Sequence, residues 1–101
     1  MKVFWTEHAL ACLTGIEEFI AEDDPAQAVH QIEKLISRTD LLCDHPLAGR
    51  KVPELRKSSL RELVEANYRI VYRVRADVVE ILSVFEGHRL FPKDLGRGGH
   101  P

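Results

Sequence analysis

The clearest pattern of hydrophobic and polar positions lies in residues 68–75, which read Tyr-Arg-Ile-Val-Tyr-Arg-Val-Arg. Aromatic and β-branched residues dominate this stretch and alternate with long polar ones, which is typical of a β-strand. One face would carry Tyr68, Ile70, Tyr72 and Val74, and the other Arg69, Val71, Arg73 and Arg75. A face with three arginines requires a polar environment or a partner on that side of the sheet.

Two further apolar-rich segments flank this strand, at residues 60–66 and 78–85. The links between the three segments are short, with Asn67 on one side and Ala76-Asp77 on the other. Short links favour an antiparallel meander. Residues 2–6 form another predicted strand, which we expect to pair beside the third or the last strand of the sheet.

A helical period of apolar residues follows the first strand. Thr6 can cap this helix, because its hydroxyl can accept from a free backbone N–H of the first turn. The glutamates of the segment fall off the apolar stripe and should face solvent. The stripe contains Ala9, Leu13, Ile16 and Ile20, and it is widened by Leu10 and Phe19.

The second helix has the strongest start signal in the chain. Asp24 suits the N-cap, Pro25 the first helical position, and Gln27 the capping-box position. We expect this helix to end before His45-Pro46, since the residue before a proline avoids the helical region. A short turn between the two helices predicts an antiparallel helical hairpin. The apolar face of this second helix contains Val29, Ile32, Leu35 or Ile36, Thr39 and Leu42.

The predicted order is strand, helix, helix and three strands (β-α-α-β-β-β). This order indicates an α+β domain in which the helical hairpin packs on a small antiparallel sheet. Residues 46–55 contain two prolines and a glycine and are predicted to form a loop. Arg50 and Lys51 in this loop are candidate contact residues. We expect a single domain over residues 1–95 and a disordered tail over residues 96–101.

Charge is distributed unevenly along the 101 residues, although the net charge is only −2. Residues 1–49 contain three Lys/Arg and nine Asp/Glu, whereas residues 50–75 contain eight Lys/Arg and three Asp/Glu. The basic middle segment is suited to an acidic partner segment or to a phosphate backbone. A solvated sheet face with local ion pairs would explain the same charges equally well.

We expect neither a membrane segment nor a metal or cofactor. No apolar run approaches the ~20 residues of a membrane helix, and the first residues lack a signal-peptide layout, so we expect a cytoplasmic protein. Cys12 and Cys43 are expected to be buried, reduced thiols without a CxxC partner. The scattered histidines, which lack metal-ligand spacing, are His8, His30, His45 and His100.

A series of short motifs follows one another along the chain. They are Trp5-Thr6 with Ala9, Asp24-Pro25-Ala26, residues 45–50 (His-Pro-Leu-Ala-Gly-Arg), Val52-Pro53-Glu54, Arg61-Glu62-Leu63, residues 68–73 and residues 84–89 (Val-Phe-Glu-Gly-His-Arg). In order and spacing these motifs resemble the RelE/ParE superfamily of toxins from type II toxin–antitoxin systems. The resemblance spans about residues 3–91.

The resemblance implies a small stable toxin that a cognate antitoxin holds inactive. In such systems the C-terminal segment of the antitoxin wraps the toxin, so the partner would lie over the groove between the helical hairpin and the strands. RelE-like members cleave messenger RNA in the ribosome without a metal, whereas ParE-like members poison DNA gyrase. The implied target is therefore either the ribosome or gyrase.

The resemblance also places Arg69 where a RelE-like toxin carries an active-site arginine. Leu60 and Glu62 then fall where RelE-like toxins carry catalytic lysines. Leucine cannot carry charge, and a glutamate would repel the scissile phosphate. These departures and the negative net charge favour a ParE-like gyrase inhibitor without catalytic activity of its own. The alternative is a RelE-like ribosome-dependent endoribonuclease that uses Arg61, Arg69, His88 and Arg89, with His88 as acid or base.

A wider set of residues is expected to bind the antitoxin or the target. The arginines among them have a structural alternative, because they could pair with Glu62, Glu65 and Glu80 across the sheet. The two tyrosines share a face with Ile70 and Val74, which favours a core or groove-lining position. The set is Arg50, Lys51, Arg61, Tyr68, Arg69, Tyr72, Arg73, His88 and Arg89.

Overall fold

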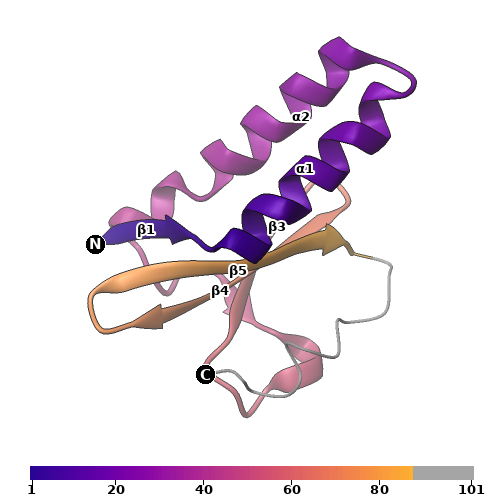
Figure 1. The fold of residues 1–101 in the computed structure, drawn as a ribbon. Coiled ribbons are helices and arrows are strands. Elements are labelled where there is room, and N and C mark those ends of the chain that lie inside the picture. The colour runs from indigo at the N-terminus through magenta and orange to yellow at the C-terminus, as the bar shows by residue number, and fades with distance from the viewer. Residues whose placement is uncertain (88–101) are drawn as a thin grey trace.

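The computed structural model of the chain describes residues 1–87 (Figure 1). Two helices, α1 and α2, lie side by side over one face of a five-stranded sheet. The α+β class and the helical hairpin are therefore confirmed. The elements are β1 (Lys2–Trp5), α1 (Glu7–Ala21), α2 (Pro25–Arg38), the 3₁₀ turns η1 (Asp40–Cys43) and η2 (Pro53–Leu55), β2 (Arg50–Lys51), β3 (Arg61–Glu65), β4 (Tyr68–Arg75) and β5 (Val78–Glu86).

The strands are arranged in the order β1-β5-β4-β3-β2. Strands β3, β4 and β5 form the expected antiparallel meander. The sheet as a whole is mixed, because β1 pairs with β5 in parallel, from Lys2 opposite Val78 to Trp5 opposite Ile81. This pairing covers the edge of β5 that the meander leaves open. Part of the predicted loop is also a strand, since β2 pairs with the start of β3.

Both helices begin at the predicted caps. The Thr6 hydroxyl accepts from the Ala9 N–H at 3.1 Å, and Asp24 accepts from the Gln27 N–H at 3.1 Å. The second helix ends earlier than expected, at Arg38. The Thr39 hydroxyl donates to the Ile36 carbonyl at 2.8 Å, a local bond that competes with continued helix. Thr39 and the η1 turn after it remain in the core.

The apolar stripes of the two helices are narrower than predicted. Ala9, Leu13 and Leu35 are buried as expected. Leu10, Phe19 and Val29 were predicted to belong to the stripes, but each is at least half exposed. Each helix packs on one layer only, so a narrow stripe is sufficient to cover the sheet. On α2 the small Ala28 is buried, whereas Val29 beside it is exposed.

The sheet has an apolar cluster on each face. The larger cluster lies under the helices and includes Ile70 and Tyr72 of β4. The smaller one lies on the opposite face and joins Val52, Leu60 and Val71. This division confirms the alternation predicted for β4. The face with the arginines is therefore not open to solvent along its whole length, because residues 52–60 cover part of it.

The described residues bear on the expectations for the two cysteines and for a membrane segment. Both cysteines are free, but Cys43 is exposed and was wrongly expected to be buried, because η1 turns its side chain outwards. Among residues 1–87, no helix is long and apolar enough to cross a membrane. The predicted tail at residues 96–101 and the last part of the predicted domain lie outside the described residues.

We expect Ile70→Ala to lower the free energy of unfolding by about 2–5 kcal/mol, because it removes a fully buried side chain from the centre of the sheet. Ile36→Ala is the matched control, since Ile36 is 43% exposed, and it should cost much less. Urea denaturation of both variants measures the difference. Equal losses would contradict the assignment of the core face.

Candidate functional site

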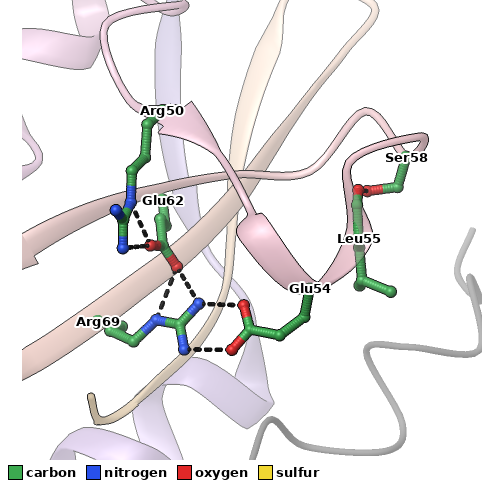
Figure 2. Close-up of polar contacts among 6 residues, drawn as sticks. All are labelled: Arg50, Glu54, Leu55, Ser58, Glu62 and Arg69. Carbon is green, nitrogen blue, oxygen red and sulfur yellow. Dashed lines mark hydrogen bonds and ion pairs between the residues drawn. The ribbon is translucent and has the colours of Figure 1, made fainter. Parts of the chain in front are cut away.

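A row of four alternating charges crosses the sheet face that points away from the helices (Figure 2). Arg50 donates to Glu62 through Nε at 2.6 Å. Arg69 donates through its own Nε to the other oxygen of Glu62 at 2.8 Å. The Nη1 and Nη2 groups of Arg69 donate to the two carboxylate oxygens of Glu54, at 2.8 and 2.7 Å. This Arg50–Glu62–Arg69–Glu54 chain is called the charge chain below.

Strand register explains how distant residues meet in the charge chain. Arg50 of β2 lies directly opposite Glu62 of β3. Arg69 of β4 lies opposite Val64, so Glu62 is its diagonal neighbour on the same face. Glu54 belongs to η2, which brings its carboxylate over Arg69. The charge chain therefore joins β2, η2, β3 and β4.

Burial makes the pairing in the charge chain obligatory at its centre. The Glu62 side chain is 0% exposed and the Arg69 side chain 8%. Ionised groups at such positions are tolerated only when they are paired and hydrogen-bonded. The two ends reach solvent, because Arg50 is 60% exposed and Glu54 42%. The Arg69 guanidinium also lies 5.4 Å from the centre of the Phe85 ring.

The same contacts change the pKa values of two members. The hydrogen bonds from Arg69 lower the pKa of Glu54 below its ordinary value of 4.5. Arg69 in turn has a pKa above its ordinary range, chiefly because of its bonds with Glu54. Both groups are therefore charged at neutral pH. The positive charge of Arg69 is offset by the carboxylates on either side.

Arg69 and Arg73 thus take the structural alternative that the sequence left open. Arg69 pairs with Glu62, and Arg73 pairs with Glu80 across β4 and β5 at 2.6 Å. Arg61 donates to the carbonyl of Gly49 at 2.8 Å and, at 3.4 Å, to that of Leu47. The three arginines do not form one cluster, because Arg61 projects from the opposite face of β3 from Glu62.

Tyr72 was a candidate contact residue, but it is fully buried. Its hydroxyl accepts from the Gly49 N–H and donates to the Pro46 carbonyl, both at 2.8 Å. Burial raises the pKa of this hydroxyl, so it stays protonated and keeps donating at neutral pH. A Cβ at position 49 would approach Tyr72 to 2.7 Å and the Glu62 carbonyl to 2.6 Å, so this turn requires glycine.

The remaining candidates differ in their accessibility. Arg50 and Lys51 are exposed on the edge strand, and Arg61 is half-buried. Tyr68 is 7% exposed. His88 and Arg89 lie outside the described residues. No group of three or more His, Cys, Asp or Glu side chains within residues 1–87 is arranged to hold a metal ion.

A groove of about 520 Å³ runs between α1 and the end of β5. Phe19, which lines it, is 69% exposed, which is unusual for so large an apolar side chain. Phe19 was predicted to belong to the apolar stripe of the helix, but it lines this groove instead. Gly15, one turn earlier in α1, is the feature of the sequence that could have indicated a hollow on this side. The lining residues are His8, Cys12, Gly15, Ile16, Phe19, Tyr68, Ser83, Val84, Phe85 and Glu86.

We expect Glu54→Gln to change how stability depends on pH. The folded pKa of Glu54 is lowered, so its contribution is fully present above the unfolded value of 4.5 and is lost as the pH falls through the folded value. The stability advantage of the wild type over the variant should therefore shrink as the pH falls from about 6 to 3. Urea denaturation at each pH measures it.

Glu33→Gln provides the baseline for this experiment. It makes the same substitution at an exposed position of α2, where Glu33 has no ion pair among the described residues. A wild-type advantage over Glu54→Gln that stays constant with pH would contradict the ion pair with Arg69.

The comparisons with known proteins all match toxins or toxin–antitoxin systems. The family model described as "ParE toxin of type II toxin-antitoxin system, parDE" matches residues 3–91. A Sinorhizobium fredii protein named toxin Y4kP is 38% identical over 93% of this chain and 96% of its own. A Caulobacter vibrioides protein named toxin RelE2 is 36% identical over 88% of this chain and 98% of its own.

A solved structure supports the same fold. A chain of the chromosomal ParDE toxin–antitoxin system from P. aeruginosa matches with a TM-score of 0.70 and 24% identity. The match covers 85% of this chain and 95% of that one. At this identity the likeness shows the fold alone, and the family rests on the sequence comparisons. The chain belongs to the ParE toxin family of type II toxin–antitoxin systems.

Proposed function

We propose that this toxin inhibits DNA gyrase by binding to it, without chemistry of its own. The observation that carries this proposal is the state of Arg69, whose side chain is 8% exposed and is held between Glu54 and Glu62. A metal-independent nuclease needs cations that are free to meet the charge that develops on the phosphate. Arg69 is committed to two carboxylates instead.

The neighbouring positions support the same proposal. Leu60 and Glu62 occupy the places where the resemblance implies catalytic lysines in RelE-like toxins. Leu60 is buried in the smaller apolar cluster, and Glu62 adds a negative charge beside Arg69. The contacts of Leu60 and Glu62 therefore suit a structural role better than the cleavage of a phosphodiester.

A RelE-like ribosome-dependent endoribonuclease is the second candidate. Two observations favour it: the name RelE2 of the Caulobacter vibrioides relative, and the absence of a carboxylate partner for Arg61 among residues 1–87. In that case Arg61 would have to act with His88 and Arg89. The same induction experiment tests both candidates.

The cognate antitoxin is proposed to occupy the groove between α1 and β5. Ile16 and Phe19 supply apolar surface there. Such a groove suits the apolar face of an amphipathic segment that binds along a helix. We assign this place to the C-terminal segment of the antitoxin, and we place the complex in the cytoplasm, where gyrase acts on DNA.

Purified toxin should inhibit supercoiling of a relaxed plasmid by gyrase, or trap cleaved plasmid. Induction in cells without the antitoxin should give the same defect in plasmid supercoiling while messenger 5′ ends remain unchanged. Codon-phased messenger cuts with normal supercoiling would overturn the proposal in favour of the nuclease. Arg61→Ala is then the variant that should abolish the cuts.

We expect Gly15→Gln to weaken antitoxin binding while the toxin stays folded. A Cβ at position 15 meets nothing within 4 Å, and replacing a glycine inside a helix adds up to about 1 kcal/mol of stability. The longer side chain would project into the groove. Glu17→Gln, which puts a glutamine on the other side of α1, is the control.

Calorimetry with the cognate antitoxin measures this effect, and thermal denaturation checks the fold. Loss of affinity for Gly15→Gln alone supports the groove as the docking site. Equal affinities for the two folded variants would place the antitoxin elsewhere.

A further inference from the structure

The sheet edge formed by β2 and η2 carries an excess of positive charge. The two acidic residues of this region, Glu54 and Glu62, are both used within the charge chain. The cations that remain have no carboxylate partner among the residues that the structure describes. They are Lys51, Arg56, Lys57 and Arg61, and they are called the basic edge below.

Strand register places two of these cations face to face. Lys51 of β2 lies directly opposite Arg61 of β3. Like charges at opposed positions of an antiparallel pair are destabilising. Neither side chain is neutralised: Lys51 donates to the Ser58 carbonyl at 3.2 Å, and Arg61 donates to backbone carbonyls. A bound anion would offset this repulsion.

A hollow of about 390 Å³ opens at the same edge. Its lining contains three cations and Pro53, and it contains no acidic residue. Two of the cations are held in place, because Glu62 fixes Arg50 and the Ser58 carbonyl binds Lys51. The third, Arg56, follows η2 directly. The hollow is therefore a concave surface with one sign of charge and partly fixed donors.

We propose that the basic edge binds the phosphodiester backbone of a nucleic acid. Lysine and arginine bind phosphates without apolar contacts. A peptide segment, in contrast, relies on buried apolar anchors, and the hollow offers only Pro53. Nucleic-acid binding at this edge goes beyond the proposed target and does not depend on whether gyrase is that target.

The distribution of charge over the whole chain supports this orientation. Residues 1–49, which include both helices, contain nine acidic residues against three basic ones. A polyanion would repel this half and attract the basic edge. The toxin would therefore approach a nucleic acid with β2 and η2 first and the helical hairpin away from it.

The test measures binding of the full-length toxin to a fluorescent duplex DNA, and to an RNA duplex of the same sequence, over a range of salt concentrations. Lys51→Gln/Arg56→Gln should make the slope of log K against log salt shallower by about 2. Lys2→Gln/Lys34→Gln removes the same charge outside the basic edge and should keep the wild-type slope. Lys51→Gln alone should change the slope by about 1, and it replaces the double variant if that one does not fold.

A shallower slope for the basic-edge variants supports the site. Tighter binding of DNA would then identify duplex DNA as the source of the phosphates, and tighter binding of RNA would identify RNA. Equal slopes for the wild type and the folded basic-edge variants would overturn the proposal. Competition by a polyglutamate peptide as strong as that by DNA of equal charge would also overturn it, in favour of an acidic polypeptide.

Discussion

The buried carboxylate of Glu62 is the constraint on which this face of the sheet depends. It has no access to water, so it must be paired, and Arg50 and Arg69 bind one oxygen each. Arg69 then needs a second acid, which Glu54 supplies from η2. The row of charges therefore fixes β2 and η2 against β3 and β4 (Figure 2). A buried pair of this kind is costly to break by removing one partner.

This arrangement has consequences for both sides of the toxin. It uses both acids of the region, so the exposed edge at Lys51 and Arg56 remains positively charged. It also removes Arg69 from the surface, where a nuclease would need it. The surface on the helix side differs from this edge, because the groove beside Phe19 exposes apolar side chains there. The groove proposed for the partner, at α1 and β5, and the basic edge proposed for phosphates, at β2 and η2, are thus different surfaces of the toxin.

Local signals predicted much of the fold. The alternation in β4 identified both faces, and Thr6 and Asp24 identified the helix starts, because caps and strand periodicity depend on neighbours in sequence. The pairings of β1 and β2 depend on distant residues. The sequence therefore left β1 beside either the third or the last strand, of which the last is correct, and it did not indicate the strand β2. From the sequence, Glu62 was interpreted either as repelling a phosphate or as pairing with an arginine across the sheet. The register of β2, β3 and β4 decides for pairing and shows that the partners are Arg50 and Arg69.

The claim that Arg69 supports the fold and performs no chemistry can be tested by replacing the buried pair with apolar residues. Glu62→Leu/Arg69→Met removes both central charges, and the partners left behind, Arg50 and Glu54, can reach water. Such replacements of a buried pair are often neutral for stability or better. The measurement is inhibition of gyrase supercoiling by the folded double variant. We expect inhibition equal to that of the wild type. Loss of inhibition in a variant with an unchanged melting temperature would mean that the Arg69 side chain itself takes part in inhibition.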